Sequence, residues 1–79
     1  MTEGSKYVKL VEWSEEDQCF IGSCPELAYG GCHGDDPRAV FEELCQLVEE
    51  LVELYHRDGK QLPAPMCGRD FVNAMQKAA

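Results

Sequence analysis

Apolar residues recur at every third or fourth position between residues 37 and 58, which is the spacing of an amphipathic helix. Asp36 is a good N-cap, and Pro37 suits the first helical position, where its missing N–H costs nothing. Gly59 suits the left-handed position just after a helix end. The pattern therefore predicts a helix over 37–58. Its apolar positions are Val40, Phe41, Leu44, Leu47, Val48, Leu51, Val52, Leu54 and Tyr55.

The chain before this helix has the pattern of short strands. Residues 6–13 are rich in β-branched and aromatic side chains and partly alternate, and residues 18–24 follow a polar turn. Pro25 ends the second strand because proline cannot donate to a ladder. Residues 30–33 suit a short third strand that ends at Gly34, and the glycines of this region favour a bulge or a close backbone approach.

After the helix, a Leu-Pro-Ala-Pro run over 62–65 forms a stiff exit. In the tail, Phe71, Val72, Met75 and Ala78 fall at helical spacing and favour a short helix, with a strand over 71–73 as the alternative. We therefore expect an α+β fold of the order β-β-β-α, a small antiparallel sheet packed on one long helix. The domain is expected over 1–65 and the tail over 66–79.

Charge narrows the choice of partner. The chain has 15 acidic and seven basic residues and a net charge of −8. We expect no direct binding of nucleic acid, because phosphate affinity comes from lysine and arginine. Such a charge favours a basic partner, or simply solubility. A domain of 79 residues buries only about 60% of its unfolded surface, which also favours a homo-oligomer.

The same sequence favours a cytoplasmic protein. No segment approaches the roughly 20 apolar residues of a membrane span, and the polar start has no signal-peptide pattern. An odd number of cysteines at irregular spacing does not suggest a disulfide framework, so a reducing compartment is expected. The cysteines are Cys19, Cys24, Cys32, Cys45 and Cys67.

No catalytic, metal or cofactor site is predicted. The glutamates of 37–58 lie on the polar side of the helix and do not converge as a Mg²⁺ site of a nuclease requires. Cys24, Cys32 and His33 lack the paired spacing of zinc ligands. The glycines over 30–34 lack the Lys-Ser/Thr ending of a phosphate loop and precede two aspartates.

The first strand carries more apolar surface than one helix can cover. Val8 and Leu10 point to one face of the sheet, and Tyr7, Val11 and Trp13 point to the other. Because one helix covers only one face, Tyr7, Val11 and Trp13 are the predicted partner-binding residues. The alternative is that the tail folds over this face.

Four features in order carry a family resemblance. They are Glu12-Trp13 before an acidic turn, an aromatic-led strand running into Pro25-Glu26-Leu27, the run Gly31-Cys32-His33-Gly34-Asp35-Asp36, and the run over 58–65. From Tyr7 to Pro65 the chain resembles the N-terminal domain of the HicB-like antitoxin family. Its helix start departs from the usual Gly-Asp-Thr/Ser-x-x-Glu-Ala, since Asp36 takes the hydroxyl position and Ala39 the glutamate position.

The resemblance implies a degenerate RNase H-like fold and a non-enzymatic role, the neutralisation of a small basic RNA-cleaving toxin by steric occlusion. Many members of the family also carry a C-terminal DNA-binding module, for which residues 66–79 are too few. The alternative function is a stand-alone homo-oligomeric domain with a structural or small-ligand-binding role and no toxin.

Overall fold

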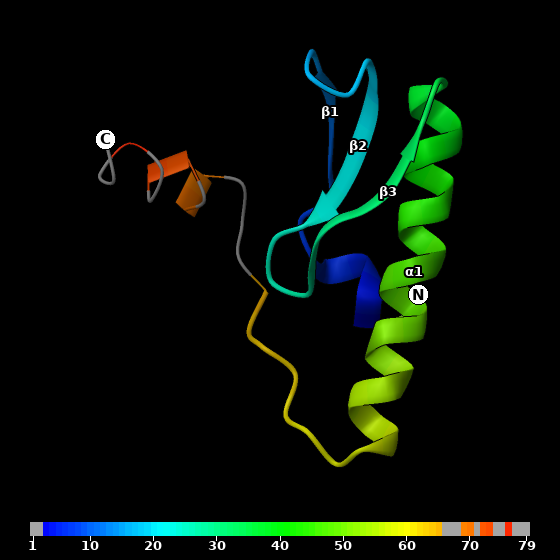
Figure 1. Cartoon of the computed structure of the whole chain (residues 1–79). Helices are drawn as coiled ribbons and strands as arrows, with labels where there is room; N and C mark the ends of the chain where they lie inside the picture. Colours follow the sequence, from blue (N-terminus) through cyan, green and yellow to red (C-terminus); the bar gives the residue numbers. More distant parts are fainter. Residues whose placement is uncertain (1–2, 66–68, 71, 74–75, 77–79) are drawn as a thin grey trace.

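The computed structural model describes residues 3–65, 69–70, 72–73 and 76 (Figure 1). Within these residues the strands form an antiparallel sheet in the order β1-β2-β3, and a long helix lies along one of its faces (Figure 1). The expected α+β fold is confirmed. The elements are a 3₁₀ turn η1 (Glu3–Lys6), β1 (Leu10–Ser14), β2 (Cys19–Cys24), β3 (Ala28–Gly34) and α1 (Pro37–Arg57).

Local backbone chemistry sets both ends of α1. Asp36 is extended, with φ −112°, and its Oδ1 accepts the N–H of Arg38 at 3.2 Å. At the other end Gly59 has φ 68°, and the N–H of Lys60 donates to the carbonyl of Tyr55 at 2.9 Å. This is a Schellman ending, which uses the left-handed conformation that glycine adopts without strain. The predicted capping residues are confirmed.

A tight turn joins β1 to β2. The N–H of Gln18 donates to the carbonyl of Ser14 at 2.8 Å, and Gln18 itself has a φ of 55°. Ser14 Oγ also accepts the N–H of Asp17 at 3.2 Å. The turn sets a register in which Trp13 lies opposite Phe20 and Val11 lies opposite Gly22.

The chain before β1 differs from the prediction. A strand was expected from residue 6, but β1 begins at Leu10, and the chain before it forms η1. The N–H of Tyr7 donates to the carbonyl of Gly4 at 3.3 Å, and Lys9 Nζ donates to the same carbonyl at 2.8 Å. Lys9 Nζ also lies 3.2 Å from the carbonyl of Tyr7. These local hydrogen bonds pair the backbone carbonyls within a bend, where a strand would pair them with a neighbouring strand.

The core lies between α1 and the inner side of β2 and β3. A Cβ placed on Gly22 of β2 would lie 3.0 Å from Val40 Cγ1, and one placed on Gly31 of β3 would lie 2.5 Å from Leu47 Cδ2. Glycine at these two positions therefore lets the helix approach β2 and β3 closely. The buried core residues are Tyr7, Cys24, Cys32, Val40, Leu44, Val48 and Val52.

β3 is longer than predicted and its pairing is irregular. It begins at Ala28, ahead of the expected residue 30. Its register with β2 shifts between Gly22 and Cys24, and Gly22 and Gly31 approach the helix closely, so the expectation of a bulge or a close backbone approach is confirmed.

In the tail, the described residues Arg69, Asp70, Val72, Asn73 and Gln76 are helical and exposed. They stand apart from the sheet in Figure 1, and the side chain of Val72 is 47% exposed. Because Val72 and Asn73 are helical, the alternative of a strand over 71–73 is not observed. Phe71, Met75 and Ala78, on which the predicted short helix also relied, lie outside the described residues. No helix within the described ranges combines the length and the apolar character needed to cross a membrane.

Candidate interaction surface

The prediction that Tyr7 presents its side chain on an uncovered sheet face is wrong. Tyr7 is only 6% exposed and belongs to the core, where its hydroxyl donates to the carbonyl oxygen of Pro63. The physical reason is that strand alternation does not extend back to Tyr7, because the chain bends before Leu10.

Val11 and Trp13 lie on the side of the sheet that faces α1, so their predicted face is also wrong. Val11 packs against the core and lies opposite Gly22, and Gly22 approaches Val40 of α1. Alternation then places Trp13 on the same side as Val11. Alternation groups residues by face but does not say which face the helix covers, and the glycine in β2 decides this.

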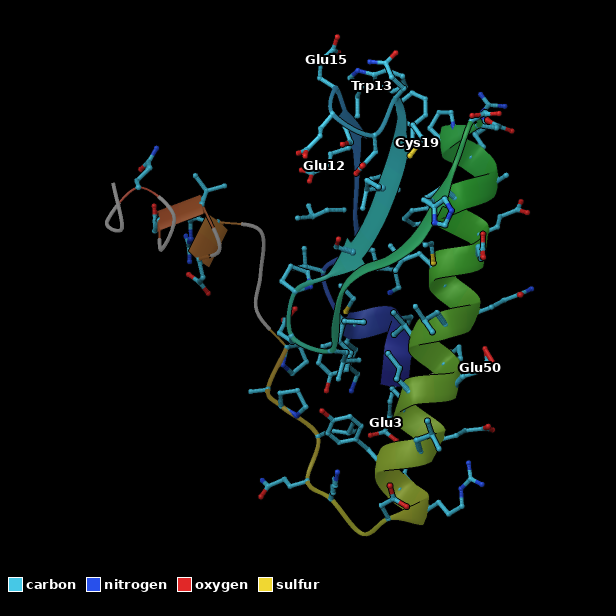
Figure 2. All side chains as sticks on the ribbon, in the orientation of Figure 1. Glu3, Glu12, Trp13, Glu15, Cys19 and Glu50 are labelled. Carbon is cyan, nitrogen blue, oxygen red and sulfur yellow. The ribbon has the colours of Figure 1, made fainter. Side chains whose placement is uncertain are left out.

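The outer face of the sheet is mixed in character. Leu10 and Glu12 lie on this face, and Glu12 points away from α1 (Figure 2). Glu12 lies opposite Ile21, which in turn lies opposite His33. Leu10 and Ile21 are half-buried, whereas Glu12 and His33 are exposed. Polar and apolar side chains therefore alternate here, and the face is less apolar than the sequence predicted.

A groove runs along α1 beside η1 and β1, because the helix packs mainly on β2 and β3 and covers β1 only in part. One part of it is a cavity of about 480 Å³ that includes Lys9, Phe41 and Cys45 in its lining. The other part, of about 370 Å³, is lined by Val11 and again by Phe41. We call this surface the β1–α1 groove, and its lining residues are Ser5, Lys9, Val11, Pro37, Arg38, Phe41, Glu42, Cys45, Gln46 and Glu49.

Phe41 lines this groove, and Trp13 lies on the same face of β1 as the groove-lining Val11. Trp13 is 48% exposed and Phe41 is 45% exposed. The ring of Trp13 meets that of Phe20 edge to face, with centroids 5.1 Å apart. Its Nε1 donates to Glu15 Oε2 at 2.6 Å at the tip of the β1–β2 hairpin (Figure 2). The Trp13 ring is thus held in place with one side open to solvent.

Phe41 is the residue of this surface that the sequence analysis did not single out. It was counted among the apolar positions of the helix, which favoured burial. The row that is buried in α1 instead repeats every fourth residue through Val40, Leu44, Val48 and Val52. The signal available in the sequence was the width of the predicted apolar stripe. A stripe wider than the sheet can cover leaves the residues at its edges, such as Phe41, exposed.

The groove is lined by two acidic and two basic side chains, and a nearby turn adds further acids. Glu42 and Glu49 line it, and the turn beyond β1 carries Glu15, Glu16 and Asp17. On the basic side, the ammonium of Lys9 is bonded to the carbonyls of Gly4 and Tyr7, and Arg38 is exposed at the far end. The lining is therefore balanced in charge, and the excess of negative charge belongs to the neighbouring turn and to the chain as a whole.

The buried cysteines are packing residues rather than reactive groups. Burial raises the pKa of the Cys24 thiol, and a hydrogen bond from the backbone of Leu27 opposes this only in part. Burial also raises the pKa of the Cys32 thiol, with a further contribution from the negative charge of Glu43. Because the thiolate is the nucleophile, both thiols are unreactive at neutral pH. Within the described residues no three His, Cys, Asp or Glu side chains gather where they could hold a metal ion.

The groove therefore offers apolar surface and a half-exposed aromatic ring, Phe41, with charged residues of both signs in its lining, which are features of a binding surface. Comparison with known proteins adds no family, because no family model, no curated protein and no solved structure matches this chain.

Proposed function

We propose that this chain is a non-enzymatic binding domain of the HicB-like antitoxin type, which acts in the cytoplasm by occluding a small basic RNA-cleaving toxin. The β1–α1 groove carries this proposal, since Phe41 lines it with a half-exposed ring and Trp13 presents a second half-exposed ring on the same face of β1 as Val11. Tryptophan is among the residues enriched at the energetic centres of interfaces. A partner that covers these rings removes apolar surface from water, at about 25 cal/mol per Å² before the costs of association.

Charge supports a basic partner. With 15 acidic and seven basic residues, the chain carries a net charge of −8. A toxin that cleaves RNA must expose cationic groups to hold the phosphate backbone. An acidic protein seated over those groups competes with the RNA electrostatically and excludes it sterically. The cysteines within the described residues, Cys19, Cys24, Cys32 and Cys45, are free thiols, which fits the reducing conditions of the cytoplasm.

Co-expression tests this function. The basic protein of the neighbouring reading frame is induced alone and together with this chain, and growth and RNA integrity are measured. We expect the toxin alone to arrest growth and cleave RNA, and this chain to reverse both effects. A neighbouring frame that encodes no short basic protein, or a toxin that this chain neither binds nor inhibits, would contradict the proposal.

A further inference from the structure

We infer that the partner docks as an extended segment along the outer edge of β1 and places alternate apolar side chains into the β1–α1 groove. The basic character of this partner rests on the proposed function. The mode of docking rests on geometry, namely a strand edge that runs beside an apolar groove.

The outer edge of β1 can accept another strand. Within the described residues β1 is the first strand of the sheet and pairs with β2 on one side. An added strand would form main-chain hydrogen bonds with the backbone groups on the other side. β1 has five residues, Leu10–Ser14, so the segment that pairs with it is short.

The position of α1 gives the added strand a place for its side chains. Successive side chains of a strand point to opposite faces, so every second residue of the added strand would face the helix side. Val11 and Phe41 line the groove on that side, and Trp13 lies on the same face of β1. Aliphatic side chains of the added strand would contact Phe41, which is 45% exposed in the chain alone. The other side chains of the strand would lie on the outer face, next to Glu12.

Charge selects a basic segment over a second copy of this chain. Glu12 is the middle residue of β1, so an antiparallel pair of two β1 strands in symmetric register would bring Glu12 opposite its own copy. Like charges directly opposite each other in a sheet are destabilising. Two copies also each carry a net charge of −8. A segment that alternates basic and apolar residues meets Glu12 with opposite charge and the groove with apolar surface.

Synthetic peptides test the docking mode without knowledge of the natural partner. The probe is a short peptide that alternates lysine with valine, and the controls are the same composition with the lysines in one block and an alternating glutamate–valine peptide. Trp13 is the single tryptophan of the chain, so its fluorescence reports on the helix-facing side of β1. We expect the alternating basic peptide to shift this emission and to slow amide hydrogen exchange in β1, and the controls to do neither.

A matched pair of variants locates the contact. Phe41→Ala removes a ring from the groove, whereas Leu54→Ala removes a side chain of similar exposure, 40%, elsewhere on α1. We expect Phe41→Ala to weaken binding of the alternating basic peptide about thirtyfold, the size of a hot-spot loss, and Leu54→Ala to leave it unchanged. Circular dichroism and the thermal midpoint establish that both variants are folded, and the exchange measurement on the wild-type chain needs no variant.

Several results would overturn the inference. One is binding of the alternating peptide with exchange protection along β3 and none along β1. Another is equal binding of the block and alternating peptides, which would mean charge attraction without strand pairing. A dimer that dissociates on Phe41→Ala would show that a second copy of the chain occupies the groove. Peptide binding that occurs only after the chain is truncated at Pro65 would show that the tail occupies it. A toxin complex that forms but is insensitive to Phe41→Ala would contradict this inference and leave the proposed function intact. Peptide binding without inhibition of any toxin would contradict the proposed function and leave this inference intact.

Discussion

Tyr7 joins two segments that are far apart in the sequence. Its ring is buried in the core, and its hydroxyl donates to the carbonyl oxygen of Pro63, which lies after α1. Burial raises the pKa of the hydroxyl, and the negative charges of Glu26 and Glu3 raise it further. The phenol therefore stays neutral at physiological pH, and its hydrogen bond holds the segment that leaves α1 against the start of the chain.

Removal of this hydroxyl tests its contribution to stability. We expect Tyr7→Phe to lower the free energy of unfolding by about 1 kcal/mol, because the ring stays buried and the Pro63 carbonyl loses its donor. Urea denaturation of both proteins gives the difference. Tyr55→Phe, a half-buried ring on α1, is the matched control. Equal stability of Tyr7→Phe and the wild type would mean that water replaces the hydroxyl at no cost.

Ionisable groups in the core predict a loss of stability at high pH. Burial raises the pKa of the Cys24 and Cys32 thiols above the ordinary value of 9.0, so the folded state holds their protons more tightly than the unfolded state does. Their stabilising contribution is complete below pH 9 and is lost as the pH rises through the folded-state pKa values. Tyr7 acts in the same direction above its ordinary value of 10.0.

Denaturant titrations between pH 7 and pH 11, under reducing conditions, measure this loss. We expect the free energy of unfolding to be level up to about pH 9 and to decline above it. Replacement of both thiols, Cys24→Ala with Cys32→Ala, removes their part of the decline. A stability that rises above pH 9 would contradict the assignment of both thiols to the core.

At the scale of single elements, α1 has a narrow buried row with exposed margins. Val40, Leu44, Val48 and Val52 follow one another at four-residue spacing and are buried. Phe41 and Leu54 lie outside this row and are 45% and 40% exposed. The helix thus supplies the core with one row of side chains and leaves apolar residues at its margins for other contacts.

Two leucines of α1 allow the stability contributed by the buried row to be compared with that contributed by its margin. Leu44 is fully buried, whereas Leu51 is half-buried. We expect Leu44→Ala to lower the free energy of unfolding by about 2–5 kcal/mol through lost packing and the cavity it leaves. Leu51→Ala should cost clearly less, because solvent and neighbouring side chains can fill the space. Thermal or urea unfolding measures both, and an equal cost would contradict the observed burial of the row.

The ends of the elements differ in how far local sequence determines them. Asp36 and Gly59 act on backbone groups within a few residues, so the bounds of α1 followed from the sequence. The start of β1 did not follow from the sequence. Tyr7 has the β-propensity of a strand residue, but its contact with Pro63 lies 56 positions away, and no local pattern reports such a contact.

For the whole molecule, net charge acts over distances that single contacts do not reach. A charge of −8 on 79 residues raises the local concentration of basic molecules around the chain. Salt screens this field, since the Debye length is only about 10 Å at 0.1 M ionic strength. Raised salt should therefore weaken the long-range attraction of a basic partner. Loss of an apolar side chain should instead weaken the contact within the β1–α1 groove.

Binding of a basic partner separates the two effects. We expect raised salt to slow association, and Trp13→Asp to speed dissociation by about tenfold or more, because it removes an aromatic contact. Stopped-flow mixing or surface plasmon resonance measures both rates. Leu54→Asp adds the same charge at another exposed apolar position of α1 and is the control. Equal effects of Trp13→Asp and Leu54→Asp on dissociation would mean that the added charge alone weakens binding. Unfolding of Trp13→Asp would show that Trp13 is needed for the fold.

Sequence alone determined the features that depend on near neighbours and on composition. These are the strand–strand–strand–helix order, the capping residues of α1, the glycine-associated bulge and the acidic charge. Tertiary structure alone decided that Tyr7 is buried, that Val11 and Trp13 face α1, and that Phe41 borders an open groove. The physical reason is that periodicity sorts side chains by face, whereas the face that is covered depends on where two elements fit together, here at Gly22 and Gly31.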